Sequence, residues 1–228
     1  MELSEVLGFM SYMFAQAEDA GVITYLQEKF VAGGGFMYPI LACLIIGLAF
    51  SFERFWTLTR ASMNTKKFII TVKDALTKGG VDEAIKVCEN TRGSIASVFH
   101  AGLLRADEGL DAAEKAIMTY GSIEMGFLER GLIWISTFIT IAPMLGFTGT
   151  VQGMIQAFDS IAASAQMSPS VVAAPIGVAL LTTLFGLVTA IILQFFYNYF
   201  VARIDKLVSD MEESSIELID ALYEMKKK

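Results

Sequence analysis

The sequence predicts an all-α integral membrane protein, in which three transmembrane helices are extended by a cytoplasmic helical bundle. Of the 228 residues, 54% are hydrophobic, and the mean hydropathy of +0.56 is far above that of an ordinary soluble domain. The charged residues stand in blocks that are separated by long uncharged stretches. Soluble core helices as apolar as these would need burial on every side, so a membrane is favoured.

Three uncharged stretches are long enough to cross the hydrocarbon core, which takes about 20 apolar residues. We expect transmembrane helices over 31–56, 131–158 and 171–202. The Ser- and Ala-rich segment 159–170 is expected to be a periplasmic hairpin. Residues 1–30 show apolar side chains near helical spacing, which predicts a periplasmic helix at the membrane surface. Glu2 and Glu5 stand where a signal peptide would carry positive charge, so this segment is expected to remain uncleaved.

Lysine and arginine residues predict the orientation. They cluster after the first span and follow the third, whereas the loop between the second and third spans has none. Cytoplasmic loops carry the excess of basic residues. We therefore expect the N-terminus and the hairpin to be periplasmic, 57–130 to be a cytoplasmic helical domain, and 203–228 to be a cytoplasmic C-terminal helix.

Within the cytoplasmic part, two long helices are expected. A basic helix should continue the first span from Thr57 to Lys78, where Gly79 and Gly80 end it. A second helix should start at Asp111. No proline follows until Pro143, so this helix is expected to run without a break into the second span.

Small residues line one face of the second span and one face of the third. Spacings of four, three and four residues place each set on a single helix face, and the sets are Gly146, Thr150, Gly153 and Ala157 in the second span and Ala179, Thr183, Gly186 and Ala190 in the third. The candidate packing or pore-lining residues are Pro143, Gly146, Gly149, Gly153, Ala179 and Gly186, and the candidate ion-pathway residues are Thr150, Thr182 and Thr183. Such faces commonly pack helices, and threonine hydroxyls bond to their own helix. Spacing alone leaves packing and pore lining both open.

Residues 142–158, Ala-Pro-Met-Leu-Gly-Phe-Thr-Gly-Thr-Val-Gln-Gly-Met-Ile-Gln-Ala-Phe, resemble the second-span signature of the ExbB/TolQ/MotA proton-channel family. Residues 179–187 resemble the third-span signature of the same family. The pair Glu53-Arg54 and the Gly-x-x-x-Ala-x-x-x-Cys-Glu pattern over 80–89 also resemble it. The resemblance covers the chain from about residue 30 to its end.

The resemblance implies a motor subunit of the bacterial inner membrane. It implies a homopentamer whose pore holds a dimer of an ExbD/TolR-like partner with one span per chain. An aspartate of that partner would carry the ion, and Thr150 and Thr183 match the family's threonines facing the pathway, with Thr182 beside them. Ion flow would drive work on periplasmic or outer-membrane partners. Besides this partner only membrane lipids are expected, and no cofactor.

The sequence departs from the family at Val178, where ExbB and TolQ proteins usually have a glutamate. None of the three predicted spans has a carboxylate inside it, since Glu53 and Asp159 lie at span ends. A charge within the membrane is costly and usually functional. The ion carrier must then come from the partner, and sodium is an alternative to the proton, because it accepts hydroxyl and carbonyl oxygens as ligands.

Charged residues just inside the second span could have more than one role. Glu124, Glu129 and Arg130 would form a cation-attracting inner vestibule in a ring, or else a solvated face or inter-subunit salt bridges. A structural membrane scaffold without ion conduction is the alternative function. An enzyme is not supported, because hydrolase and metalloprotease motifs and paired membrane carboxylates are lacking. Neither a metal site nor nucleic-acid binding has support.

Overall fold

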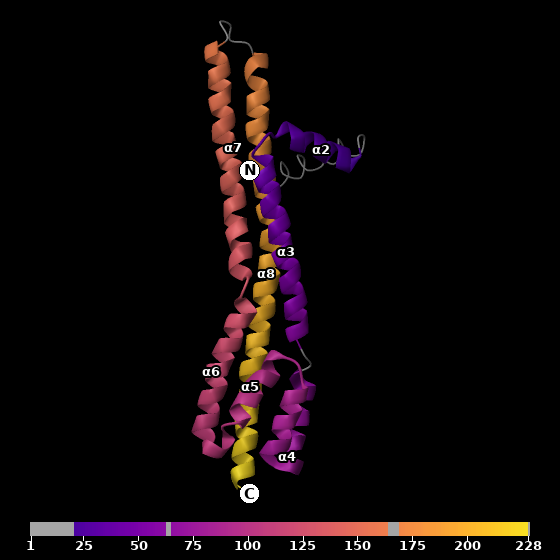
Figure 1. Cartoon of the computed structure of the whole chain (residues 1–228), viewed down its shortest axis with the longest axis vertical. Coiled ribbons are helices and arrows are strands. Elements are labelled where there is room, and N and C mark those ends of the chain that lie inside the picture. Colours follow the sequence, from indigo (N-terminus) through magenta and orange to yellow (C-terminus); the bar gives the residue numbers. More distant parts are fainter. Residues whose placement is uncertain (1–20, 63–64, 164–168, 228) are drawn as a thin grey trace, which may run out of the picture. The chain divides into compact units, whose positions relative to one another are not determined.

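The computed structural model describes residues 21–62, 65–163 and 169–227, and every regular element in these ranges is a helix. Predicted features within residues 1–20 and 164–168 lie outside the described ranges. The elements are α2 (Val22–Ala32), α3 (Met37–Ala61), α4 (Thr65–Asn90), α5 (Ser94–Leu103), the 3-10 helix η1 (Ala106–Glu108), α6 (Leu110–Glu129), α7 (Leu132–Ala163) and α8 (Pro169–Lys227) (Figure 1). The all-α prediction is confirmed.

Three helical stretches of the described chain are long and apolar enough to cross a membrane, as predicted. They contain α3, α7 and α8. Only 28%, 22% and 33% of their most apolar windows are buried within the chain. Most of these apolar side chains therefore face outward, as expected for contact with lipid or with other subunits.

The boundaries of the first span differ from the prediction. The expected start at residue 31 falls in α2, which ends at Ala32. Gly33, Gly34 and Gly35 then form a turn in which Gly34 has a φ of 73°, a conformation that favours glycine. As a result, α3 begins at Met37.

The third span and the C-terminal helix form one continuous helix, α8, of 59 residues. At 1.5 Å per residue its length is about 88 Å. The hydrocarbon core of a bilayer is only about 30 Å thick, so α8 must extend well beyond it.

The described chain forms two compact units. The membrane unit comprises the described residues up to Leu48 and those from Ser136 to Gln194. The bundle unit comprises those from Ala49 to Ile135 and from Phe195 onward. The first unit contains the predicted small-residue faces, and the second contains most of the charged residues.

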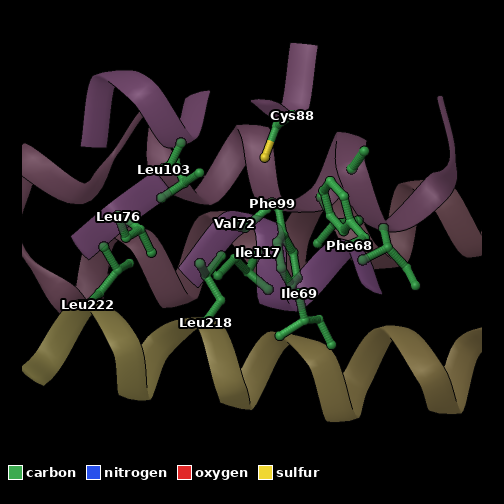
Figure 2. Close-up of a cluster of buried hydrophobic side chains, with 14 of the residues drawn as sticks. Phe68, Ile69, Val72, Leu76, Cys88, Phe99, Leu103, Ile117, Leu218 and Leu222 are labelled. Carbon is green, nitrogen blue, oxygen red and sulfur yellow. The ribbon is translucent and has the colours of Figure 1, made fainter. Parts of the chain in front are cut away.

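The bundle unit has its own hydrophobic core, built from α4, α5, α6 and α8 (Figure 2). Leu218 and Leu222 of α8 point towards Val72 and Leu76 of α4. Cys88 lies in the same core, and burial raises the pKa of its thiol to about 12. The thiol is therefore protonated and unreactive at neutral pH, which suits a packing role. The main core residues are Phe68, Ile69, Val72, Leu76, Ala84, Cys88, Ile95, Val98, Phe99, Leu103, Ile117, Leu218 and Leu222.

The expected continuous helix from Asp111 into the second span is interrupted. α6 ends at Glu129, and α7 begins at Leu132. Between them Gly131 has a φ of 98°, which L-residues with a side chain rarely adopt. The absence of proline before Pro143 therefore did not imply an unbroken helix, because a glycine with a left-handed backbone ends the helix here.

A buried arginine packs against the break between α6 and α7, which we call the α6–α7 joint. Arg54 is only 7% exposed, and its guanidinium donates to the carbonyl of Phe127, at 3.5 Å, near the end of α6. The same group pairs with Glu53 at 2.6 Å. A Cβ added to Gly131 would lie 3.0 Å from Arg54 Nε. The Arg54 guanidinium thus offsets orphan carbonyls at the helix end and packs where only glycine leaves room.

Gly131→Ala should destabilise the protein by about 1–3 kcal/mol, because an alanine is strained at this φ and contacts Arg54. Gly126→Ala is the matched control. Gly126 lies in α6 with nothing within 4 Å of an added Cβ, and alanine favours a helix by about 1 kcal/mol over glycine. Thermal unfolding in detergent should show a lower Tm for the first variant and an equal or higher Tm for the second. Equal Tm values for both would contradict the role given to the joint.

Candidate functional site

The small-residue faces of α7 and α8 lie directly against each other in the membrane unit. A Cβ added to Gly146 would lie 2.8 Å from the Thr182 carbonyl oxygen, and one added to Gly186 would lie 2.7 Å from that of Ala142. At Gly153 the added Cβ would lie 2.8 Å from the Ala179 Cβ. Only hydrogen fits at these positions, so the two backbones approach more closely than larger residues would permit.

Three threonine hydroxyls gather around one carbonyl in this contact. The Gly146 carbonyl oxygen accepts from Thr183 Oγ1 at 3.1 Å and, at longer range, from Thr182 and Thr150, both at 3.4 Å. Thr150 Oγ1 also donates to the Phe147 carbonyl at 2.6 Å. The hydroxyl oxygens of Thr150 and Thr183 are 3.4 Å apart. The structure therefore brings the three predicted threonines together.

The three threonines differ in exposure. Thr182 is 1% exposed, donates to the Ala179 carbonyl at 2.9 Å, and occupies the space left by Gly149, where an added Cβ would lie 2.5 Å from its hydroxyl oxygen. Its hydroxyl is sealed between the helices. Thr150 and Thr183 are half-buried. Of the three threonines, Thr150 and Thr183 are the two that retain partial exposure.

Sequence reasoning missed two residues of the contact. The Ala142 carbonyl lies against Gly186, and the Pro175 carbonyl would lie 2.9 Å from a Cβ at Gly153. Ala142 stands one helical turn before Gly146, which is the signal that would have identified it. Pro143 follows it inside α7, and lacks the N–H that would bond the carbonyl of Ile139.

Val178 lies on α8 near the glycine turn that precedes α3. A Cβ added to Gly34 would be 3.6 Å from Val178 Cγ1. The neighbouring Ala179 faces Gly153 instead. The side chain at the position where the resembling family usually has a glutamate therefore points away from the small-residue contact.

The polarity of the site comes from hydroxyl and carbonyl groups alone. From Ser136 to Phe158 and from Val172 to Gln194 the sequence contains no Asp, Glu, Lys, Arg or His. Among the described residues, no group of three or more His, Cys, Asp or Glu side chains is placed to hold a metal ion. The arrangement can offer oxygen ligands or anchor water, but it has no group that takes up and releases a proton.

The three predicted vestibule residues lie in the bundle unit. Glu129 and Arg130 line a shallow depression at the α6–α7 joint, together with Phe127 and Trp134. Both charged residues are exposed. Glu124 lies on α6 before them, is half-buried, and does not line this depression.

Comparison of the sequence with known proteins identifies its family. Residues 90–213, more than half of the chain, match the model of the MotA/TolQ/ExbB proton channel family. An ExbB homologue of Methanothermobacter thermautotrophicus is 33% identical over 81% of this chain and 66% of its own length. An ExbB-like protein of Synechocystis sp. is 30% identical over 73% of this chain and 66% of its own length. A biopolymer transport protein ExbB of Xanthomonas campestris is 32% identical over 48% of this chain and 45% of its own length.

The matches thus span slightly less than two thirds of the length of the first two relatives. The family match includes the Thr150–Thr183 pair and the whole α7–α8 contact. The chain is a multi-pass membrane protein that belongs to the MotA/TolQ/ExbB proton channel family.

Proposed function

We propose that this protein is the ion-conducting ring subunit of an inner-membrane motor. The motor couples proton-motive force to mechanical work on periplasmic or outer-membrane partners. The observation that carries the proposal is the half-buried Thr150–Thr183 pair, whose hydroxyl oxygens are 3.4 Å apart on a closely packed α7–α8 contact. Family membership supports the same function.

The carrier of the ion comes from another chain in this proposal. The only carboxylates near the spans, Glu53 and Asp159, lie at span ends, so the subunit has no carboxylate of its own to bind and release protons inside the membrane. A homopentamer would surround a dimer of an ExbD/TolR-like partner with one span per chain. An aspartate of that partner supplies the titrating group, and Thr150 and Thr183 provide hydroxyl oxygens beside its path.

The distribution of basic residues supports the orientation. Arg54, Arg60 and several lysines follow the first span, and Arg203 and Lys206 follow the third. We infer that the bundle unit is cytoplasmic, and that the N-terminus and the hairpin of 159–170 are periplasmic. The exposed Glu129 and Arg130 then lie at the inner mouth of the pore, where a ring of five repeats each charge.

The coupling ion is the proton in the first form of the proposal and sodium in the second. Val178 supports the second form, since it removes the membrane glutamate usual in ExbB and TolQ proteins. Hydroxyl and carbonyl oxygens suffice as sodium ligands. A flux assay with each cation alone separates the two.

The alternative function is a membrane scaffold that does not conduct ions. The observation in its favour is that each threonine hydroxyl of the site already donates to a backbone carbonyl. In that case the hydroxyls serve only to hold α7 against α8.

Native mass spectrometry tests the proposal. The protein would be co-expressed with its genomic neighbours, purified in detergent and weighed intact. Five copies with two copies of a single-span protein are expected. A monomer or dimer without such a partner would favour the scaffold and contradict the motor.

A further inference from the structure

The bundle unit has an open groove between α6 and α8, with a volume of about 690 Å³. Its apolar lining includes Met118, which is 68% exposed, and Ile216, which is 66% exposed. The charged residues that line it, Glu114, Glu212 and Asp220, are all acidic. An apolar groove of this size with acidic edges is typical of an interaction surface, and its charge favours a basic occupant.

The same unit carries a surface of complementary character on α4. One side of α4 points into the core towards α8 (Figure 2). The other side exposes Lys66, Lys67 and Lys78, together with Ile70, which is 61% exposed. Asp74 is the acidic residue on this side, so the surface is net positive. We call it the basic side of α4.

We propose that the acidic groove of one copy binds the basic side of α4 of a second copy. This inference rests on the proposed function, because it assumes that the protein works as a ring. The lengths agree: the groove runs from Val208 to Asp220 along α8, and the basic side runs from Lys66 to Lys78. Each covers about 18 Å at 1.5 Å per residue.

The two surfaces also lie at the same level along α8. Ser62, just before α4, accepts a hydrogen bond from Arg203 at 3.1 Å, and Lys73 of α4 pairs with Glu217 at 2.5 Å. The basic side of α4 is thus level with the groove of its own copy. A rotation alone, without a shift along α8, brings the next copy's α4 to the groove.

Contact between two different surfaces of identical chains is heterologous. Such contacts close into a ring when the operation is a pure rotation, and otherwise they continue as an open helix. Each copy gives its α4 to one neighbour and receives α4 from the other. The contact therefore produces a ring and not an isolated dimer.

Cross-linking between two differently tagged full-length copies tests the contact. One copy carries Lys66→Cys and the other carries Glu212→Cys, and membranes that contain both are treated with a short bismaleimide. The native cysteines stay in place because both are buried. A product with both tags is expected, at least tenfold more abundant than with either variant alone.

The matched control replaces Glu212→Cys with Glu213→Cys, because Glu213 is exposed on α8 but does not line the groove. Equal cross-linking of both positions would overturn the contact. The same sample would be weighed intact by native mass spectrometry. Rings without the doubly tagged product would overturn the contact but leave the proposed function standing, whereas monomers would overturn both.

Discussion

Gly153→Leu abolishes the packing of α7 on α8. An added Cβ alone would lie 2.8 Å from the Ala179 Cβ and 2.9 Å from the Pro175 carbonyl oxygen, and neither atom can move without shifting the backbone of α8. Overpacking of this kind typically costs 1–3 kcal/mol, and we expect about 3 kcal/mol here. Size-exclusion chromatography of the detergent extract should show loss of the monodisperse peak.

Gly177→Leu is the control for this variant. Gly177 also lies in the membrane unit on α8, but nothing lies within 4 Å of an added Cβ. The control should keep the elution profile and the Tm of the unsubstituted protein. A Gly153→Leu variant with an unaltered oligomer mass and Tm would refute the close packing of α7 on α8.

Thr183→Val removes one hydroxyl of the half-buried Thr150–Thr183 pair with little change of volume. A hydrogen bond to a charged group contributes about 1.5–3 kcal/mol, so ion flux through the complex in proteoliposomes should fall roughly tenfold or more. The oligomer mass should stay the same, because valine retains the shape of threonine at a half-buried position.

Thr148→Val separates this effect from a general loss of hydroxyls. Thr148 is exposed on α7 and donates to the Met144 carbonyl at 2.8 Å, outside the Thr150–Thr183 pair. Its flux should equal that of the unsubstituted protein. Normal flux in Thr183→Val would remove Thr183 from the ion pathway and favour the scaffold.

The number of spans and the location of the small-residue faces could be predicted from the sequence. Charge in the membrane is so costly that uncharged stretches of this length have few alternatives. Glycines spaced by three or four residues must share a helix face. Both inferences depend on local pattern, and the structure places Gly146 and Gly153 of α7 against α8 as that pattern indicates.

The break between α6 and α7 could not be predicted in the same way. A single glycine within a helical pattern is compatible with an unbroken helix. At Gly131 the backbone has a φ of 98°, and the space for a side chain there is taken by Arg54, 77 positions earlier in the chain. The different exposure of Thr182 and Thr183 likewise depends on the exact rotation of α8 against Gly149 and Gly146, which spacing does not specify.

The hydrogen bonds at the Thr150–Thr183 pair also bear on which charge the site would favour. A carbonyl cannot donate, so Thr150 and Thr183 are the donors in their contacts with the carbonyls of Phe147 and Gly146, whereas in the contact between the two hydroxyls either oxygen can donate. When both hydroxyls donate to carbonyls, the oxygen atoms of Thr150 and Thr183 present lone pairs to any other group that approaches them. With both hydroxyls donating to carbonyls, a cation, or a water molecule that donates, would meet two acceptors 3.4 Å apart. In the proposed ion pathway, we therefore expect these formally neutral hydroxyl groups to favour cations without a carboxylate in the helix.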